Sequence, residues 1–295
     1  MIKVLGSINI DLIANAVRLP QPGETVGGTA FSMSAGGKGA NQALAARRAG
    51  RSVALTGATG RDEFAAPALA FLAEAGVDLS GVRQTEQPTG TALITVSADG
   101  ENTIVVVPGA NGVLTEDDAV ATIEGASEGD ILMLQLEVPA AVVEKALVLA
   151  RKKGLVSLLN VAPLTDDAVR LAALADIVIA NETEFALLAG IDAYSEAALA
   201  TLHARTGQTV VVTLGADGVV AASGGAVRRA EGLAIRPVDT VGAGDTFSGY
   251  LAASLDAGLS LEKSLRRAAV AGSLACLAHG AQPSIPLAEA VDAAL

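Results

Sequence analysis

Hydrophobic residues along the chain recur in two ways, as short apolar runs and as longer amphipathic stretches. From residue 130 onward the two alternate regularly. This alternation predicts a mostly parallel, doubly wound α/β sheet flanked by helices, whose ligands bind beyond the carboxyl ends of the strands. The predicted strands are 130–135, 155–159, 176–180 and 209–214, and the predicted helices are 139–152, 166–174, 182–189 and 195–205.

The first third of the chain departs from this alternation. Segments 2–5 and 52–56 are predicted strands and 62–75 a predicted helix, but several further strands have no helix between them. These lie within about residues 8–35 and 90–108, and the second range reads as a hairpin around Asp99 and Gly100. We therefore predict a separate small sheet on a single domain spanning residues 1–295.

The composition and charge of the chain disfavour some classes of binding partner. The chain has 295 residues, of which 51% are hydrophobic, and its 20 basic and 32 acidic residues give a net charge of −12. This balance argues against nucleic acid or an anionic membrane as a partner. The apolar runs fall short of a membrane span, and no signal peptide is indicated. Cys276 is the one cysteine, so no disulfide forms, and we expect a cytoplasmic protein.

The segment from Gly242 to Asp245 precedes a predicted helix that runs to about Ala257. Gly242, Ala243 and Gly244 leave the backbone N–H groups unobstructed where the helix dipole is positive, which favours an anion such as a transferring phosphoryl group. Asp245 lies at the same place and can accept a proton from an attacking hydroxyl. Taken alone, the segment is more typical of an aspartate capping a helix after a glycine turn.

Two segments near the N-terminus carry polar groups suited to a small ligand. Asn9 and Asp11 alternate along a strand, so they share a face and can bind a polyol, although a solvated strand face gives the same pattern. Residues 36–41 open a helix that reaches about Ala49, and Lys38 and Asn41 can reach one molecule together. Lys38 is followed by Gly39, which excludes a Walker A loop, and a glycine-bordered helix start is the alternative.

Further candidate positions follow the predicted strand ends. They are the polar residues Glu137, Asn160, Asn181 and Glu184, and the glycine Gly215. Asn181 and Glu184 suit a hydrated Mg²⁺ ion beside a phosphate, and equally a helix cap. With two histidines, one cysteine and no Gly-x-Ser-x-Gly segment, a serine triad and a zinc site are both disfavoured, and no dinucleotide fingerprint appears.

Motifs over nearly the whole chain identify a family. In these motifs the chain resembles the ribokinase-like (PfkB) family of sugar kinases, and residues 239–247 form the strongest of them. The others are residues 6–11, 22–25, 36–43, 134–137, 181–184 and 280–284. The resemblance implies a doubly wound α/β domain with a β-sheet lid, formed by the strands of the predicted small sheet, that pairs two subunits into a homodimer.

The resemblance also implies a role for each matching residue. It makes Asp245 the catalytic base and the amides of Gly242, Ala243, Gly244 and Asp245 the anion hole. The implied sugar contacts are Asn9, Asp11, Gly37, Lys38, Gly39, Ala40, Asn41, Glu137 and Asp245. The implied ATP contacts are Asn181, Thr213, Leu214, Gly215, Ala216, Asp217, Gly218, Gly244 and Asp245, with Glu184 near Mg²⁺. The implied loop for an activating K⁺ ion comprises Asp239, Val241, Ala275, Ala278, Gly280 and Ser284.

The implied reaction is ATP-dependent phosphorylation of the primary hydroxyl of D-ribose to D-ribose 5-phosphate. Phe31 is the one aromatic residue in the lid strands, whereas a nucleoside needs aromatic stacking. Arg18 and Lys38 are the nearest cationic groups, which disfavours a sugar phosphate. Ala269 stands near the expected adenine position, where relatives often carry His or Asn. Deoxyribose, a ketose or a non-catalytic role in sugar binding remain alternatives.

Overall fold

A nine-stranded sheet forms the centre of the molecule. The computed structural model describes all of residues 1–295. The strand order is β13-β12-β11-β10-β9-β8-β1-β4-β5, and all neighbours are parallel except β11–β12 and β12–β13. The strands are β1 (Ile2–Leu5), β4 (Val53–Thr59), β5 (Asp78–Gln84), β8 (Ile131–Leu134), β9 (Val156–Asn160), β10 (Ile177–Asn181), β11 (Thr209–Thr213), β12 (Val219–Ser223) and β13 (Ala226–Ala230). The predicted fold class is thus confirmed.

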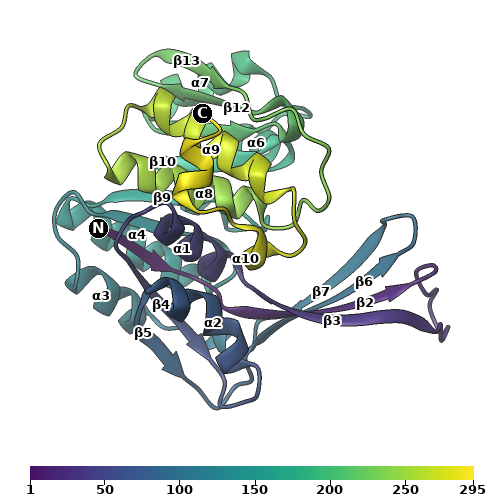
Figure 1. Ribbon diagram of the computed structural model, residues 1–295. Helices are drawn as coiled ribbons and strands as arrows, with labels where there is room; N and C mark the ends of the chain where they lie inside the picture. Colours follow the sequence, from purple (N-terminus) through teal and green to yellow (C-terminus); the bar gives the residue numbers. More distant parts are fainter.

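Helices cover both faces of this sheet (Figure 1). One hydrophobic core lies under α1 (Lys38–Arg48), α2 (Ala65–Ala75), α8 (Ala243–Asp256), α9 (Leu261–Ala275) and α11 (Ala288–Asp292). The other lies under α3 (Glu116–Glu124), α4 (Ala140–Lys153), α5 (Ala168–Ala172), α6 (Glu182–Ala189) and α7 (Glu196–Thr206). In β8, Met133 points to the first core and Leu132 to the second, since strand side chains alternate. None of the helices combines the length and apolar character that a membrane crossing requires.

Helices α1 and α8 pack unusually closely because Gly249 lies between them. A Cβ atom at Gly249 would stand 2.5 Å from the Cβ of Ala45 and 2.6 Å from the carbonyl oxygen of Gln42. Any larger residue would push the helices apart. This close approach brings the beginning of α1 to the beginning of α8, although the two segments are some 200 residues apart in the sequence.

The small sheet extends away from the body of the molecule (Figure 1). Its order is β3-β2-β6-β7, formed by β2 (Asn9–Ala16), β3 (Gly28–Gly36), β6 (Gly90–Ser97) and β7 (Asn102–Val107). Strands β6 and β7 pair antiparallel as the predicted hairpin, while β2 and β6 run parallel. The structure confirms the small sheet expected from residues 8–35 and 90–108, which we call the lid.

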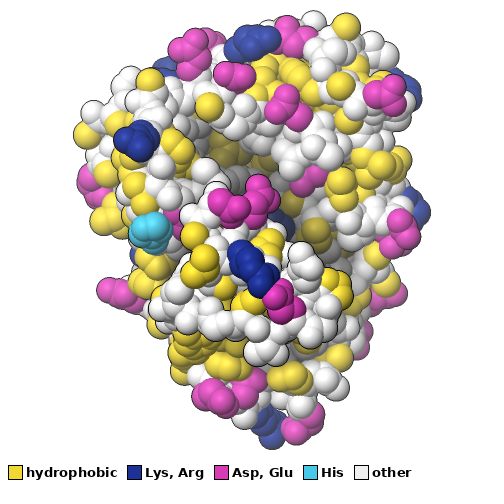
Figure 2. Space-filling model, turned by 90° about the vertical axis from the view of Figure 1, so that its right-hand side faces the viewer, with side chains coloured by type: hydrophobic (Ala, Val, Ile, Leu, Met, Phe, Trp, Pro, Cys, Tyr) yellow, Lys and Arg dark blue, Asp and Glu magenta, His cyan; other side chains and the backbone are white.

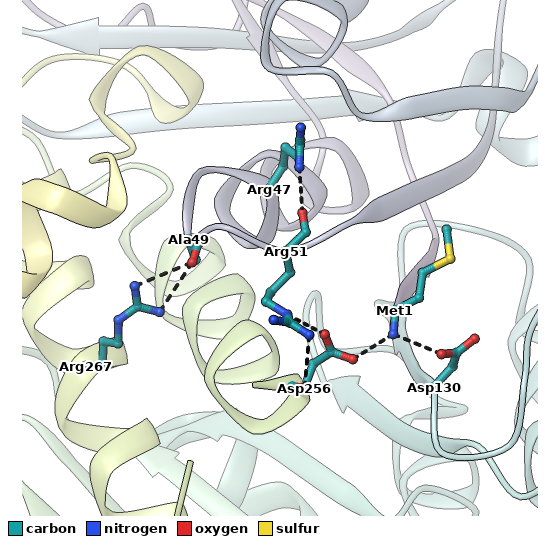
Figure 3. Close-up of polar contacts among 7 residues, drawn as sticks. All are labelled: Met1, Arg47, Ala49, Arg51, Asp130, Asp256 and Arg267. Carbon is teal, nitrogen blue, oxygen red and sulfur yellow. Dashed lines mark hydrogen bonds and ion pairs between the residues drawn. The ribbon is translucent and has the colours of Figure 1, made fainter. Parts of the chain in front are cut away.

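A polar network holds the end of α8 that lies farthest from Asp245 (Figure 3). The Asp256 carboxylate binds the Met1 ammonium at 2.8 Å and the Arg51 guanidinium at 2.5 Å. The same ammonium lies 2.9 Å from Asp130, just before β8. The network therefore joins the C-terminal end of α8 to the beginnings of β1 and β8.

Candidate active site

A cavity of about 240 Å³ lies at the carboxyl ends of β9, β10 and β11, where the first turn of α8 faces the sheet. The molecular surface is hollowed above the lid (Figure 2). Polar side chains and glycines make up most of the cavity lining. The lining residues are Lys38, Asn160, Ala162, Ile179, Asn181, Glu184, Thr213, Thr240, Gly242, Gly244 and Asp245. The cavity thus occupies the place that ligands take in doubly wound sheets.

Asp245 lies in the first turn of α8 and is 7% exposed. Two amides from α1 hold its carboxylate, since Asn41 Nδ2 donates to Oδ2 at 2.9 Å and Gln42 Nε2 donates to Oδ1 at 2.9 Å. Each oxygen keeps a free lone pair, because a carboxylate accepts about four hydrogen bonds. The group is therefore oriented and still able to accept a proton.

The backbone beside Asp245 is arranged to bind an anion. Gly242 has a φ of 77°, a left-handed conformation that glycine adopts without strain. The N–H groups of Gly244 and Asp245 have no hydrogen-bond acceptor within the protein. Because they lie at the positive end of a 14-residue helix, they can receive a phosphoryl oxygen.

Gln42 belongs to a chain of buried amides that the sequence motifs did not assign to a role. Its Oε1 accepts a hydrogen bond from Gln135 Nε2 at 2.7 Å, and its Nε2 donates to both Asp245 and Asn160. The carboxylate only accepts, which fixes the direction of the chain. The sequence gives only a weak indication of this role. Gln42 directly follows Asn41, and Gln135 lies two residues before Glu137, so that both stand beside predicted site residues.

Lys38 lies among four carboxylates at the boundary between the cavity and the lid. Its pKa is raised, chiefly by the charge of Asp245 and further by Glu137, Glu184 and Asp11, although burial lowers it. The ammonium therefore stays protonated and can neutralise an incoming phosphate. Burial raises the pKa of Asp11 to about 7, and the charges of Glu137 and Asp245 contribute to this rise.

The glycines of residues 36–39 let the predicted sugar contacts come together. A Cβ atom at Gly36 would stand 2.5 Å from Asp11 Oδ2, and one at Gly39 would stand 2.6 Å from the backbone of Gly6. Glu137 accepts hydrogen bonds from the Ser7 hydroxyl and from the Lys38 backbone N–H. Gly37, Gly39 and Ala40 thus shape the backbone, and the polar side chains around them converge.

On the opposite side of the cavity, Asn181 and Glu184 make a reciprocal capping box at the start of α6. Glu184 N–H donates to Asn181 Oδ1 at 2.8 Å, and Asn181 N–H donates to Glu184 Oε2 at 2.7 Å. Both residues also line the cavity, so the cap and a ligand role are compatible. Burial raises the pKa of Glu184.

The predicted nucleotide loop after β11 extends beyond this cavity. Thr213 belongs to the lining, whereas residues 214–218 do not. Gly215–Asp217 form a short 3-10 turn, η2, and the Leu214 N–H bonds the Gly218 carbonyl at 2.8 Å. Asn160, Thr240, Ala162 and Ile179 are lining residues that the motifs did not assign. Of these, Asn160 carries the clearest signal, because it ends a strand.

The predicted cation loop lies directly beside the anion hole. Asp239 links its two segments, since Oδ1 accepts from Val241 N at 3.0 Å and Oδ2 from Gly280 N at 2.9 Å. A Cβ atom at Gly242 would stand 2.8 Å from the Cα of Ala281. The other predicted members follow in order: Ala275 ends α9, Ala278 lies in the exposed turn, and Ser284 ends α10 (Ala281–Ser284).

Known proteins resemble the chain over its full length. Residues 1–288 match the pfkB family of carbohydrate kinases. Ribokinase of Haemophilus influenzae is 36% identical over 290 residues, covering 97% of this chain and 95% of the relative. Deoxyribokinase of Salmonella typhi is 32% identical, with coverages of 98% and 96%. The structure of Arabidopsis thaliana ribokinase complexed with ribose and ATP is 32% identical, with a TM-score of 0.90 and coverages of 99% and 97%.

Proposed function

Since the chain belongs to the pfkB family of carbohydrate kinases, we propose that it transfers the terminal phosphoryl group of ATP to D-ribose. The acceptor is the primary hydroxyl, and the product is D-ribose 5-phosphate. The full-length similarity to ribokinases supports this substrate, as does the ribose and ATP bound by the Arabidopsis relative.

The observation that carries the proposal is the position of Asp245. Its carboxylate is held by Asn41 and Gln42 at the start of a helix whose free N–H groups face the same cavity. A hydroxyl bound there loses its proton to Asp245 as its oxygen attacks the phosphorus. The N–H groups of Gly244 and Asp245 and the Lys38 ammonium stabilise the phosphoryl charge, which is how phosphoryl transfer is chiefly catalysed.

The sugar is proposed to lie under the lid, between β2 and the beginning of α1. Asn9, Asp11, Lys38, Asn41 and Glu137 offer donors and acceptors to several hydroxyls. ATP is proposed to extend from the cavity over Asn181 and the loop of residues 213–218. The deoxyribokinase relative makes 2-deoxyribose the second candidate substrate.

The proposal includes two metal ions, and the residues present fit both. Glu184 and Asn181 supply one carboxylate and one amide, which suits Mg²⁺ that keeps its other ligands from water and phosphates. Asp239 retains a lone pair on each oxygen, beside the backbone carbonyls of a tight loop, which suits K⁺. When bound, Mg²⁺ neutralises phosphate charge and K⁺ orders the neighbouring anion hole.

We further propose that the chain is one ribokinase-like domain, that two copies pair through their lids, and that the protein is cytoplasmic. The lid pairing is supported by one apolar row that crosses all four strands. Met33, Leu12, Leu93 and Val105 are register partners and therefore share a face. Met33, Leu93 and Val105 are 46–59% exposed, which is unusual for large hydrophobic residues on a sheet. The single free cysteine is consistent with a reducing compartment.

A coupled ADP-release assay tests the function. The purified protein is given ATP and Mg²⁺ with D-ribose, 2-deoxyribose, fructose or a nucleoside, with and without K⁺. We expect the highest kcat/KM with D-ribose and lower activity when K⁺ is replaced by a bulky organic cation. A higher kcat/KM with 2-deoxyribose would establish the second candidate, and no turnover with any acceptor would contradict both.

A further inference from the structure

Asn111 is a buried carboxamide that has no role in the site described above. It lies in η1 (Gly109–Val113), just after the lid, and is 1% exposed. Its Oδ1 accepts a hydrogen bond from the Ile8 N–H at 2.9 Å, and its Nδ2 donates to the Ile8 carbonyl at 3.1 Å. A backbone N–H only donates and a carbonyl only accepts, so these two bonds fix the orientation of the Asn111 amide.

The fixed amide in turn sets the orientation of Asn9. Asn111 Nδ2 directs its second hydrogen to Asn9, at a distance of 2.7 Å. A primary amide nitrogen only donates, so the Asn9 atom that faces it is Oδ1. The Nδ2 group of Asn9 is left without a partner in the protein, and it is not among the buried polar atoms sealed from solvent. Asn9 therefore offers a donor, and not an acceptor, to a ligand.

This donor lies on the strand face that contributes to the site. Asn9 and Asp11 are two residues apart in β2, so their side chains point to the same face. Asp11 lies close enough to Glu137, Asp245 and Lys38 for their charges to shift its pKa. Gly90 of β6 makes room for the amide pair. A Cβ atom at Gly90 would stand 2.2 Å from Asn111 Nδ2 and 2.3 Å from Asn9 Oδ1.

We infer that Asn111 is a positioning residue that makes Asn9 a hydrogen-bond donor to a sugar hydroxyl. The inference rests on the proposed function, because the ligand is the proposed sugar. Asn9 then donates to an oxygen of the sugar while Asp11 accepts from a neighbouring hydroxyl. This pairing of donor and acceptor distinguishes a diol from a sugar in which one hydroxyl is missing.

The Asn111→Asp variant should reverse the orientation of the Asn9 amide. The new carboxylate at residue 111 only accepts, so Asn9 must turn its Nδ2 toward it and its Oδ1 toward the sugar. We expect KM for D-ribose to rise about 10- to 100-fold, while kcat and KM for ATP stay within about threefold. Discrimination between ribose and its 2-deoxy or 3-deoxy analogue should fall for the one hydroxyl that Asn9 binds. An unchanged KM for ribose in the folded variant would overturn the inference. Gln84→Glu, the same amide-to-acid change at an exposed position in β5, is the matched control.

A second comparison does not depend on whether Asn111→Asp folds. Asn9→Asp keeps the shape and the acceptor for Asn111 but removes the donor, whereas Asn9→Ala removes both. If Asn9 acts as a donor, calorimetry will show that the two variants bind ribose about equally weakly. Wild-type affinity in Asn9→Asp would mean that the oxygen faces the sugar, and would overturn the inference. A wild-type protein that binds ribose but does not phosphorylate it would contradict the proposed function alone.

Discussion

At the scale of single residues, the proposed catalytic carboxylate depends on the amides that hold it in place. Asp245 is oriented by Asn41 and Gln42, and Gln42 is itself oriented by Gln135. A primary amide cannot take up the proton that the base receives at neutral pH. Gln42 and Gln135 therefore position the base without competing with it, and their removal should affect turnover more than substrate binding.

Gln42→Leu tests this arrangement. We expect kcat to fall about 10- to 100-fold with KM for ribose changed little, because the base loses one of the two bonds that orient it. The variant should also lose stability, since Gln135 and Asn160 lose a buried partner. The control is Gln208→Leu, which removes amide hydrogen bonds to Ala172 and Ala175 far from Asp245 and should lower the melting temperature alone. Equal kcat values for the two variants would refute the role of Gln42.

Asp11 gives a pH dependence to the stability of the sugar-free protein. Burial raises its folded pKa to about 7 from an ordinary value of 3.8, so the folded state binds the proton more tightly than the unfolded state. The free energy of unfolding therefore falls as pH rises from about 4 to about 7, and the loss is complete above that. In urea titrations, the unfolding free energy of Asp11→Asn relative to wild type should increase by about 2–3 kcal/mol between pH 5 and pH 8. An equal difference in unfolding free energy at pH 5 and pH 8 would contradict the raised pKa of Asp11. Asp166→Asn, at an exposed position, controls for the loss of one negative charge.

At the scale of elements, the site exists because α1 and α8 pack side by side with their N-terminal ends together. The sequence motifs indicated both helix starts and predicted that both face a ligand. They did not show that Asn41 and Gln42 bond Asp245, because that contact depends on how the two helices pack. The glycine that permits the packing, Gly249, lies four residues beyond Asp245 in α8.

Gly249→Val should separate these helices. The new side chain would collide with Ala45 and with the backbone of α1, so we expect a loss of about 1–3 kcal/mol in the free energy of unfolding. Because the helix starts also move, kcat should fall at temperatures where the variant is still folded. Gly125→Ala is the control, since Gly125 has an ordinary φ of −78° and an added Cβ would meet its nearest neighbour, Lys3 Nζ, at 3.6 Å, an ordinary contact distance. Wild-type kcat in folded Gly249→Val would refute the link between packing and turnover.

The alternation of apolar runs predicted the sheet and helices after residue 130 well, because each buried strand of a parallel sheet is a continuous hydrophobic run. It did not predict β5 or β13, since these edge strands carry mostly polar or small residues. It also did not predict β12 or α9. It also missed α3, although Thr115 and Asp118 form a capping box that is visible in the sequence. Asn111 escaped notice for another reason: its partners at residues 8 and 9 are about 100 positions away.

At the scale of the whole molecule, the lid carries the polar site residues on one face and exposed apolar side chains on both. Asn9 and Asp11 lie on one face, and the apolar row of Met33, Leu12, Leu93 and Val105 lies on the other. A sheet that projects from the body with an uncovered apolar row favours association with a second copy. The lid would then be stiffened by pairing, and the sugar site beneath it would be shielded from water.

Val105→Lys tests the association. Val105 lies at the β7 end of the apolar row, and a charge there should convert a dimer into a monomer in sedimentation experiments at micromolar concentration. Lys152→Glu, a charge change on the far end of α4, should leave the dimer intact. A wild-type protein that sediments as a monomer at all concentrations would contradict the lid pairing, without bearing on the chemistry of Asp245.

The proton transfer to Asp245 is the central claim, and Asp245→Asn tests it most directly. Asparagine keeps the shape of the side chain but cannot take the proton from the sugar hydroxyl. Single-turnover measurement of ADP formation should show a rate about 10²- to 10⁴-fold below wild type, while calorimetry shows ribose bound with an affinity within about tenfold. A phosphoryl-transfer rate close to that of the wild-type protein would contradict the account.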